Sequence, residues 1–108
     1  MATTEMNCLA GGGGAVSIEA DTTQVIQTAT KGVDWTATED CIMRGTVSSS
    51  GSTIWIYVNG SGLIKSALNQ TIDISQSNYG IFIPKGTTVR IGDVSDYITV
   101  SISYYAIK

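Results

Sequence analysis

Any acid–base chemistry in this chain would have to rest mainly on carboxylates, because the sequence contains no histidine. Histidine is the usual general base and zinc ligand and serves most serine and cysteine nucleophiles, so most hydrolase mechanisms are excluded. A glycosidase-type pair of acids remains, with candidates Glu19, Asp21, Asp34, Glu39, Asp40, Asp73, Asp93 and Asp96. Most of them fall in predicted turns, where aspartate caps the backbone, so we expect no catalytic residue and no enzyme.

Neither a metal site nor a cofactor site is predicted. Asp93 and Asp96 could bind calcium from one loop, but turn capping is the commoner role for two acids at this spacing. The glycine run at residues 11–14 is not followed by the Lys-Ser or Lys-Thr pair of a phosphate loop. Cys8 and Cys41 match no zinc-binding pattern, and their spacing allows a disulfide between them without implying one. Cys41 is interpreted as a small buried hydrophobic residue.

Chain length and charge limit the classes of molecule that the protein is expected to bind. The 108 residues make one domain with its own core, and only 14% of them are charged. The net charge is −3 and the basic residues are scattered singly, so nucleic acid and anionic membrane surfaces are unfavourable partners. No stretch has the pattern of a signal peptide or the length of a transmembrane helix, which predicts synthesis in the cytoplasm and no membrane insertion.

The elements that must position any site are short β-strands separated by turn residues. Residues 1–15, with the glycine run, are predicted to form a flexible arm, and residues 16–108 a β-sandwich domain. The predicted strands cover residues 16–20, 24–30, 33–36, 41–48, 53–58, 61–66, 71–75, 79–83, 87–91 and 97–108. Eight to ten strands and no helix predict an all-β, antiparallel sandwich.

Two predicted strands carry apolar residues on both faces. In residues 53–58 the apolar side chains alternate with Trp55 and Tyr57, and Asn59-Gly60 then supplies a type I′ hairpin turn. In residues 97–108 one face is apolar throughout, and the other carries Tyr97, Tyr105 and Ile107. A terminal strand of this kind is expected to lie between neighbouring strands, in the sheet interior or against another subunit.

Two segments carry a family resemblance. Residues 35–43 are similar to the aromatic-Thr-Ala-x-x-Asp-Gly-x-x pattern that opens a core strand, with Cys41 in place of the glycine. Residues 83–89 resemble an apolar-Pro-x-Lys-Gly-Asp-x-Val turn, with Thr87 in place of the acid. Together with the Asn59-Gly60 hairpin, they resemble the trimeric jelly rolls of the tumour-necrosis-factor and C1q-like class, and more closely small phage and prophage virion or tail-fibre domains.

The resemblance implies a jelly-roll sandwich that assembles as a homotrimer. Strands apolar on both sides would pack one face in the sandwich and the other against neighbouring subunits. The implied interface residues are Trp55, Tyr57, Tyr104 and Tyr105. The alternative is a monomer whose own loops cover the second face.

The leading functional hypothesis is a phage-type virion structural protein, a head-decoration, fibre or tail accessory component. It would be made in the bacterial cytoplasm, reside in the virion, and contact other virion proteins and a host-surface glycan or protein. The chain is expected to be complete rather than part of a longer fibre. The second hypothesis is a carbohydrate-binding module or lectin-like receptor-binding domain, with Trp35, Tyr79 or Tyr97 stacking on sugars.

Overall fold

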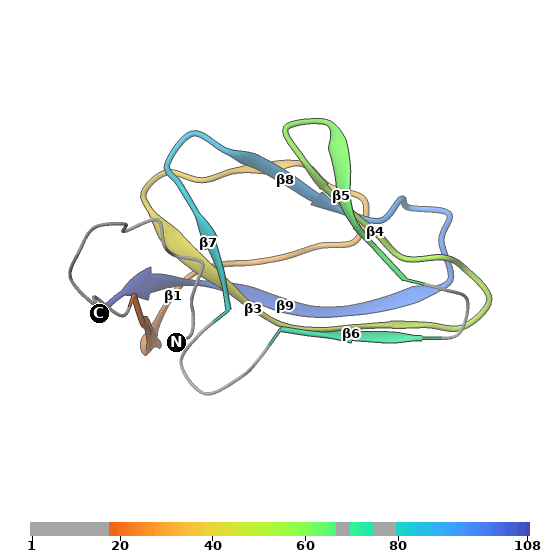
Figure 1. Ribbon diagram of the computed structural model, residues 1–108, viewed down its shortest axis with the longest axis horizontal. Coiled ribbons are helices and arrows are strands. Elements are labelled where there is room, and N and C mark those ends of the chain that lie inside the picture. The colour runs from red at the N-terminus through yellow and green to blue at the C-terminus, as the bar shows by residue number, and fades with distance from the viewer. Residues whose placement is uncertain (1–17, 67–69, 75–79) are drawn as a thin grey trace.

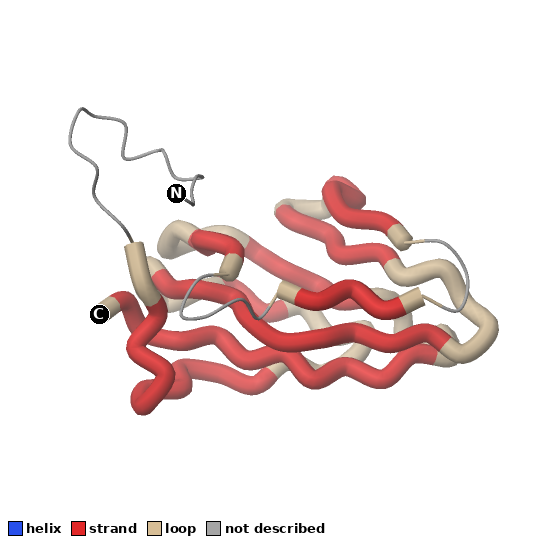
Figure 2. Tube along the Cα trace, turned by 60° about the horizontal axis from the view of Figure 1, so that its bottom comes forward, coloured by secondary structure: helices blue, strands red, loops and turns tan. Residues whose placement is uncertain are grey.

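A computed structural model describes residues 18–66, 70–74 and 80–108, which form nine strands and no helix (Figure 2). The strands are β1 (Ala20–Thr28), β2 (Trp35–Thr36), β3 (Cys41–Ser49), β4 (Trp55–Val58), β5 (Ser61–Lys65), β6 (Thr71–Asp73), β7 (Ile81–Ile83), β8 (Thr88–Ile91) and β9 (Ile98–Ile107). The predicted all-β class is confirmed. The predicted arm at residues 1–15 lies outside the described residues.

The strands form two antiparallel sheets that face each other (Figure 1). Sheet A has the order β1-β9-β3-β6. On the edge of β3 where β6 pairs with Thr46–Ser48, β7 pairs with the beginning of the strand, Cys41–Met43. Sheet B has the order β2-β8-β4-β5. Side chains that point between the sheets form one core, as a sandwich requires.

Strand β9 lies in the interior of sheet A. It pairs with β1 on one side and with β3 on the other, where the register runs without a break from Cys41–Ala106 to Ser49–Ile98. The prediction that the last strand lies between neighbouring strands is confirmed. Because each peptide group of an interior strand can bond on both sides, β9 is the element on which sheet A is assembled.

The core follows from the period of two along the strands. Alternate side chains of β3, β4 and β9 point inward, as does Ile54 just before β4, and the large fully buried ones include Met43, Ile54, Ile56, Ile102 and Tyr104. The predicted inward faces of residues 53–58 and 97–108 are therefore confirmed. Burying aliphatic side chains of this size contributes about 1.5–3 kcal/mol each.

One predicted turn is confirmed and another is not. Asn59 and Gly60 have φ of 50° and 85°, as a type I′ turn requires, and join β4 to β5. The predicted break at residues 21–23 is wrong, because these residues lie inside β1. There Asp21 accepts hydrogen bonds from the backbone and hydroxyl of Thr23, and the register with β9 shifts between Ala20 and Val25. The extra residues form an irregularity within a strand rather than ending it.

Cys41 is a buried free thiol at the start of β3, as its interpretation as a small hydrophobic residue predicted. Its Sγ lies 3.7 Å from the carbonyl oxygen of Ile83, to which it donates. Burial, assisted by the nearby carboxylates of Glu39 and Asp40, raises the pKa of the thiol from 9.0 to about 11. Cys8 lies outside the described residues.

This shift predicts a loss of stability in alkali. A folded-state pKa above the unfolded value means that the Cys41 contribution is complete below pH 9 and is lost as the pH rises toward 11. The loss from this group is about 2 kcal/mol. Urea unfolding at pH 8 and pH 11 should therefore show a larger fall for the natural chain than for Cys41→Ala. Equal falls in the two proteins would contradict the assignment.

Candidate functional site

Two of the candidate acids, Asp40 and Asp96, cap backbone amides of neighbouring loops. Asp40 Oδ1 accepts from the amide of Lys85 at 2.8 Å, and Asp96 Oδ2 accepts from the amide of Asp93 at 2.9 Å. The capping role predicted for the acids of the 93–96 loop is thus confirmed for Asp96, whereas the Asp93 carboxylate pairs with Arg90. Within the described parts of the chain, no three His, Cys, Asp or Glu side chains are grouped so that they could hold a metal ion.

The outer face of sheet B carries a ladder in which two aromatic rings lie between two cations. Lys65 Nζ lies 5.1 Å from the Trp55 ring centroid, and the Trp55 and Tyr57 rings stack at 6.1 Å with an interplanar angle of 21°. On the far side, the Arg90 guanidinium carbon lies 4.4 Å from the Tyr57 centroid. Arg90 also pairs with Asp93 at 3.2 Å.

The ladder changes the interpretation of two predicted interface residues. Trp55 and Tyr57 lie on the outer face, as the alternation predicted, but both are only half-exposed. Cation–π contacts at such sites contribute about 0.5–1 kcal/mol. Side chains of the same copy therefore cover much of these rings. Trp55 and Tyr57 therefore depend less on a second copy of the chain for shielding from water than a fully exposed aromatic pair would.

Tyr105 lies at the centre of an apolar row on the outer face of sheet A. Its neighbours across the strands are Val25 on β1 and Ile42 on β3, and Ile42 pairs in turn with Phe82 on β7. Paired residues share a face of the sheet, so these side chains form one line across four strands. We call Val25, Tyr105, Ile42 and Phe82 the outer row.

The outer row is sheltered at its centre and open at one end. Ile42 is buried, Tyr105 and Phe82 are half-buried, and Val25 is 52% exposed. Ile107, two residues beyond Tyr105 on the same face, is also exposed. The rest of this outer face is polar, with Thr46, Ser48, Thr71, Asp73, Thr99, Ser101 and Ser103 along β3, β6 and β9.

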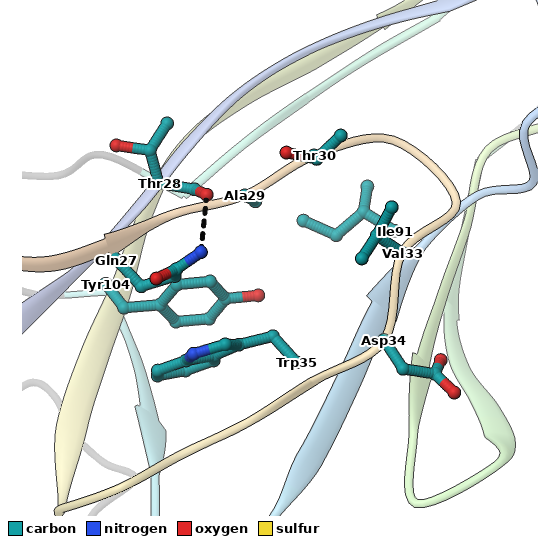
Figure 3. Close-up of a pocket in the computed structure, with 9 residues that line it drawn as sticks. All are labelled: Gln27, Thr28, Ala29, Thr30, Val33, Asp34, Trp35, Ile91 and Tyr104. Carbon is teal, nitrogen blue, oxygen red and sulfur yellow. Dashed lines mark hydrogen bonds between the residues drawn. The ribbon is translucent and has the colours of Figure 1, made fainter.

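Tyr104 does not belong to an interface. It is 1% exposed and points between the sheets, where its ring packs on Trp35 with a centroid distance of 4.2 Å (Figure 3). The prediction that Tyr104 contacts another subunit is therefore corrected. The physical reason is the alternation itself, because adjacent residues of a strand point to opposite faces and Tyr105 takes the outer one.

The predicted sugar-contact residues lie apart from one another. Trp35 is half-buried against Tyr104, whereas Tyr97 is 72% exposed beside the loop that follows β3. The Tyr97 amide donates to Ser52 Oγ at 2.9 Å, and the Ser50 amide donates to the Tyr97 carbonyl oxygen at 2.8 Å. Tyr79 lies outside the described residues. Trp35 and Tyr97 thus do not form one platform.

A concavity on the sheet B side was not predicted. It has a volume of about 350 Å³ and is lined by Asp34, Tyr57, Asn59, Gly60, Thr88 and Arg90. Asn59 Oδ1 accepts a hydrogen bond from the backbone amide of Thr88 at 2.9 Å. The side-chain nitrogen of Asn59 therefore points away from that amide. Arg90 and Asp34 lie 4.0 Å apart on its wall.

Sequence reasoning also missed the outer row. Ile42 and Phe82 alternate with the core residues of their own strands and therefore point to the opposite face of the sheet. This alternation was the signal by which the sequence could have identified them. Pairing them with Tyr105 and Val25 requires the strand order, which the alternation pattern does not contain.

A scan of protein-family models and searches of curated proteins and solved structures found no match to the chain. In the part of the chain that the structure describes, no helix is long and apolar enough to cross a membrane.

Proposed function

We propose that this chain is a non-enzymatic virion structural protein of phage type, a head-decoration, fibre or tail accessory component that assembles as a homotrimer. The observation that carries the proposal is the outer row, which places four apolar side chains in line on the solvent face of sheet A. Contiguous apolar surface of this kind marks an interaction site more often than isolated exposed residues do.

A second copy is the occupant that fits this face best. The outer row is apolar at one end of sheet A and gives way to a hydroxyl-rich surface with few charges. A surface with few charges is typical of interface cores. Tyr105 is the central residue of the proposed contact, and Arg44, whose guanidinium carbon lies 5.8 Å from the ring centroid, is the charged side chain beside it.

The strand pairing supports the jelly-roll part of the proposal. A jelly roll is an antiparallel hairpin of eight strands rolled up, so that the first strand pairs with the last, the second with the seventh, and so inward. Here β1 pairs with β9, β2 with β8, β3 with both β6 and β7, and β4 with β5. Counting β6 and β7 as one interrupted strand gives the nested order.

The proposed role depends on how the assembled subunits place their surfaces and not on a chemical reaction. In the trimer, sheet A faces the neighbouring subunits, and the loops at one end of the sandwich are free to contact other virion proteins or the host surface. The loop after β3 and the loop before β9 are joined there by the hydrogen bonds of Ser50 and Ser52 to Tyr97. A fixed pair of loops presents a defined surface, which recognition requires.

The virion assignment is tested in the organism that encodes the chain. Particles are induced, banded on a density gradient and analysed by mass spectrometry. We expect the chain to sediment with the particles in a copy number divisible by three, and to stay with them through a high-salt wash. Particles that contain none of the chain would contradict the proposal.

Saccharide binding is the second candidate, and the concavity beside Tyr57 favours it. Sugar sites combine an aromatic ring with hydrogen-bonding groups, which Tyr57, Asn59 and Arg90 supply together. A glycan array on the purified chain separates the candidates. Saturable binding that Asn59→Ala weakens would favour the lectin-like function, and no binding by a stable trimer would favour the structural one.

A further inference from the structure

A small pocket opens at the side of the sandwich, where the loop between β1 and β2 crosses from sheet A to sheet B (Figure 3). Its lining includes Ala29, Val33, Trp35, Ile91 and Tyr104. The volume is about 50 Å³. A water needs about 10–15 Å³ of such space, so the pocket admits about three waters or a group of a few atoms.

The hydroxyl of Tyr104 is the polar group at the inner end of this pocket. Figure 3 shows its oxygen pointing into the space bounded by Val33, Ile91 and Trp35. Tyr104 is 1% exposed, and none of the residues in the described ranges donates a hydrogen bond to its hydroxyl or accepts one from it. Buried hydroxyls in folded proteins nearly always have a partner, and the described residues do not supply one for Tyr104.

We propose that this pocket is a binding site for a small uncharged hydroxyl group, which hydrogen-bonds to the Tyr104 hydroxyl. Water is the occupant of the free protein, and the terminal diol of a polyol is the ligand that can replace it. Gln27 and Thr30 line the same pocket and bear the polar groups that a second hydrogen bond requires. The site differs from both the outer row and the concavity beside Tyr57.

The size and polarity of the pocket fix the class of ligand. Ligand pockets for whole organic molecules span about 300–1,000 Å³, so a complete sugar ring does not enter here. Val33, Ile91 and Ala29 make much of the wall apolar, and the carboxylate of Asp34, which also lines the pocket, points away from the Tyr104 hydroxyl (Figure 3). A charged group inside the pocket is therefore penalised. Burial raises the pKa of Tyr104 well above its ordinary value, so the hydroxyl keeps its proton at physiological pH and can donate or accept.

Nuclear magnetic resonance of the two tryptophan indoles tests the site. Trp35 lines the pocket, whereas Trp55 lies on the outer face of sheet B and serves as an internal control. We expect a magnetisation transfer from a long-lived water to the Trp35 region, and a saturable shift of the Trp35 signal with 1,2-ethanediol. A four-atom ligand reaches at best a dissociation constant of about 40 μM. Tyr104→Phe should weaken it about tenfold, the value of one hydrogen bond.

The same experiment distinguishes water from the diol as the molecule that supplies the hydroxyl group. Water transfer without a saturable diol shift identifies water as the occupant and supports the site. A diol shift confined to Trp35 and lost in Tyr104→Phe supports it with the diol as ligand. The proposal is overturned if neither signal appears, or if both are unchanged in a Tyr104→Phe protein whose unfolding transition remains cooperative.

Discussion

Gly45→Ala is expected to cost the sandwich at least about 3 kcal/mol of unfolding free energy, a large part of the stability of a small domain. Gly45 lies in β3 opposite Ile102 of β9 and has φ of 134°, a conformation that residues with a side chain rarely adopt. A β-carbon there would overlap the carbonyl oxygen of Ser101 and lie 2.9 Å from the Ile102 Cα. Both obstacles are backbone of the central strand, so no side chain can move aside.

Gly60→Ala is the matched control. Gly60 also has a positive φ, 85°, but a β-carbon at this position meets nothing within 4 Å. Its cost is therefore limited to the left-handed conformation, about 1 kcal/mol. Urea unfolding of the two variants measures the difference. Equal destabilisation would mean that the close approach of β3 and β9 at Gly45 does not exist.

Val25→Asp is expected to dissociate the proposed trimer while leaving the folded subunit intact. Val25 is the exposed end of the outer row and pairs with Tyr105. A carboxylate buried without a partner at an interface costs several kcal/mol, but in a lone subunit the same side chain stays in water. The expected loss is at least about 2 kcal/mol per contact between subunits.

Val94→Asp provides the matched change away from the outer row. Val94 is 71% exposed and lies in the loop between β8 and β9. Both variants add one negative charge to an exposed valine, so a general effect of charge on association would appear in both. Sedimentation velocity distinguishes them. If both variants sediment like the natural chain, another surface holds the copies together.

The positions of most strands follow from local sequence, because alternation and turn residues act over a few positions. Asn59-Gly60 fixes the hairpin through backbone geometry alone, and the apolar faces of residues 97–108 predict that β9 is paired on both sides. The prediction of a break at residues 21–23 was wrong because turn-forming residues also occur at irregularities inside a strand.

The site residues were harder to predict because they depend on neighbours across strands. Trp55 and Tyr57 were correctly expected on an outer face, but the cations that cover them come from β5 and β8, and only the register brings these side chains together. The outer row likewise needs the order of four strands. Tyr104 was assigned to an interface because the family resemblance implied one, although its phase in the last strand already indicated the core.

Light scattering of the purified chain over a range of concentrations tests the central claim, that copies of this protein cover the outer row of sheet A. One chain has a mass of 11.4 kDa, and we predict a mass three times this value that Val25→Asp reduces to that of a single chain. A natural chain that stays at 11.4 kDa at every concentration would contradict the account.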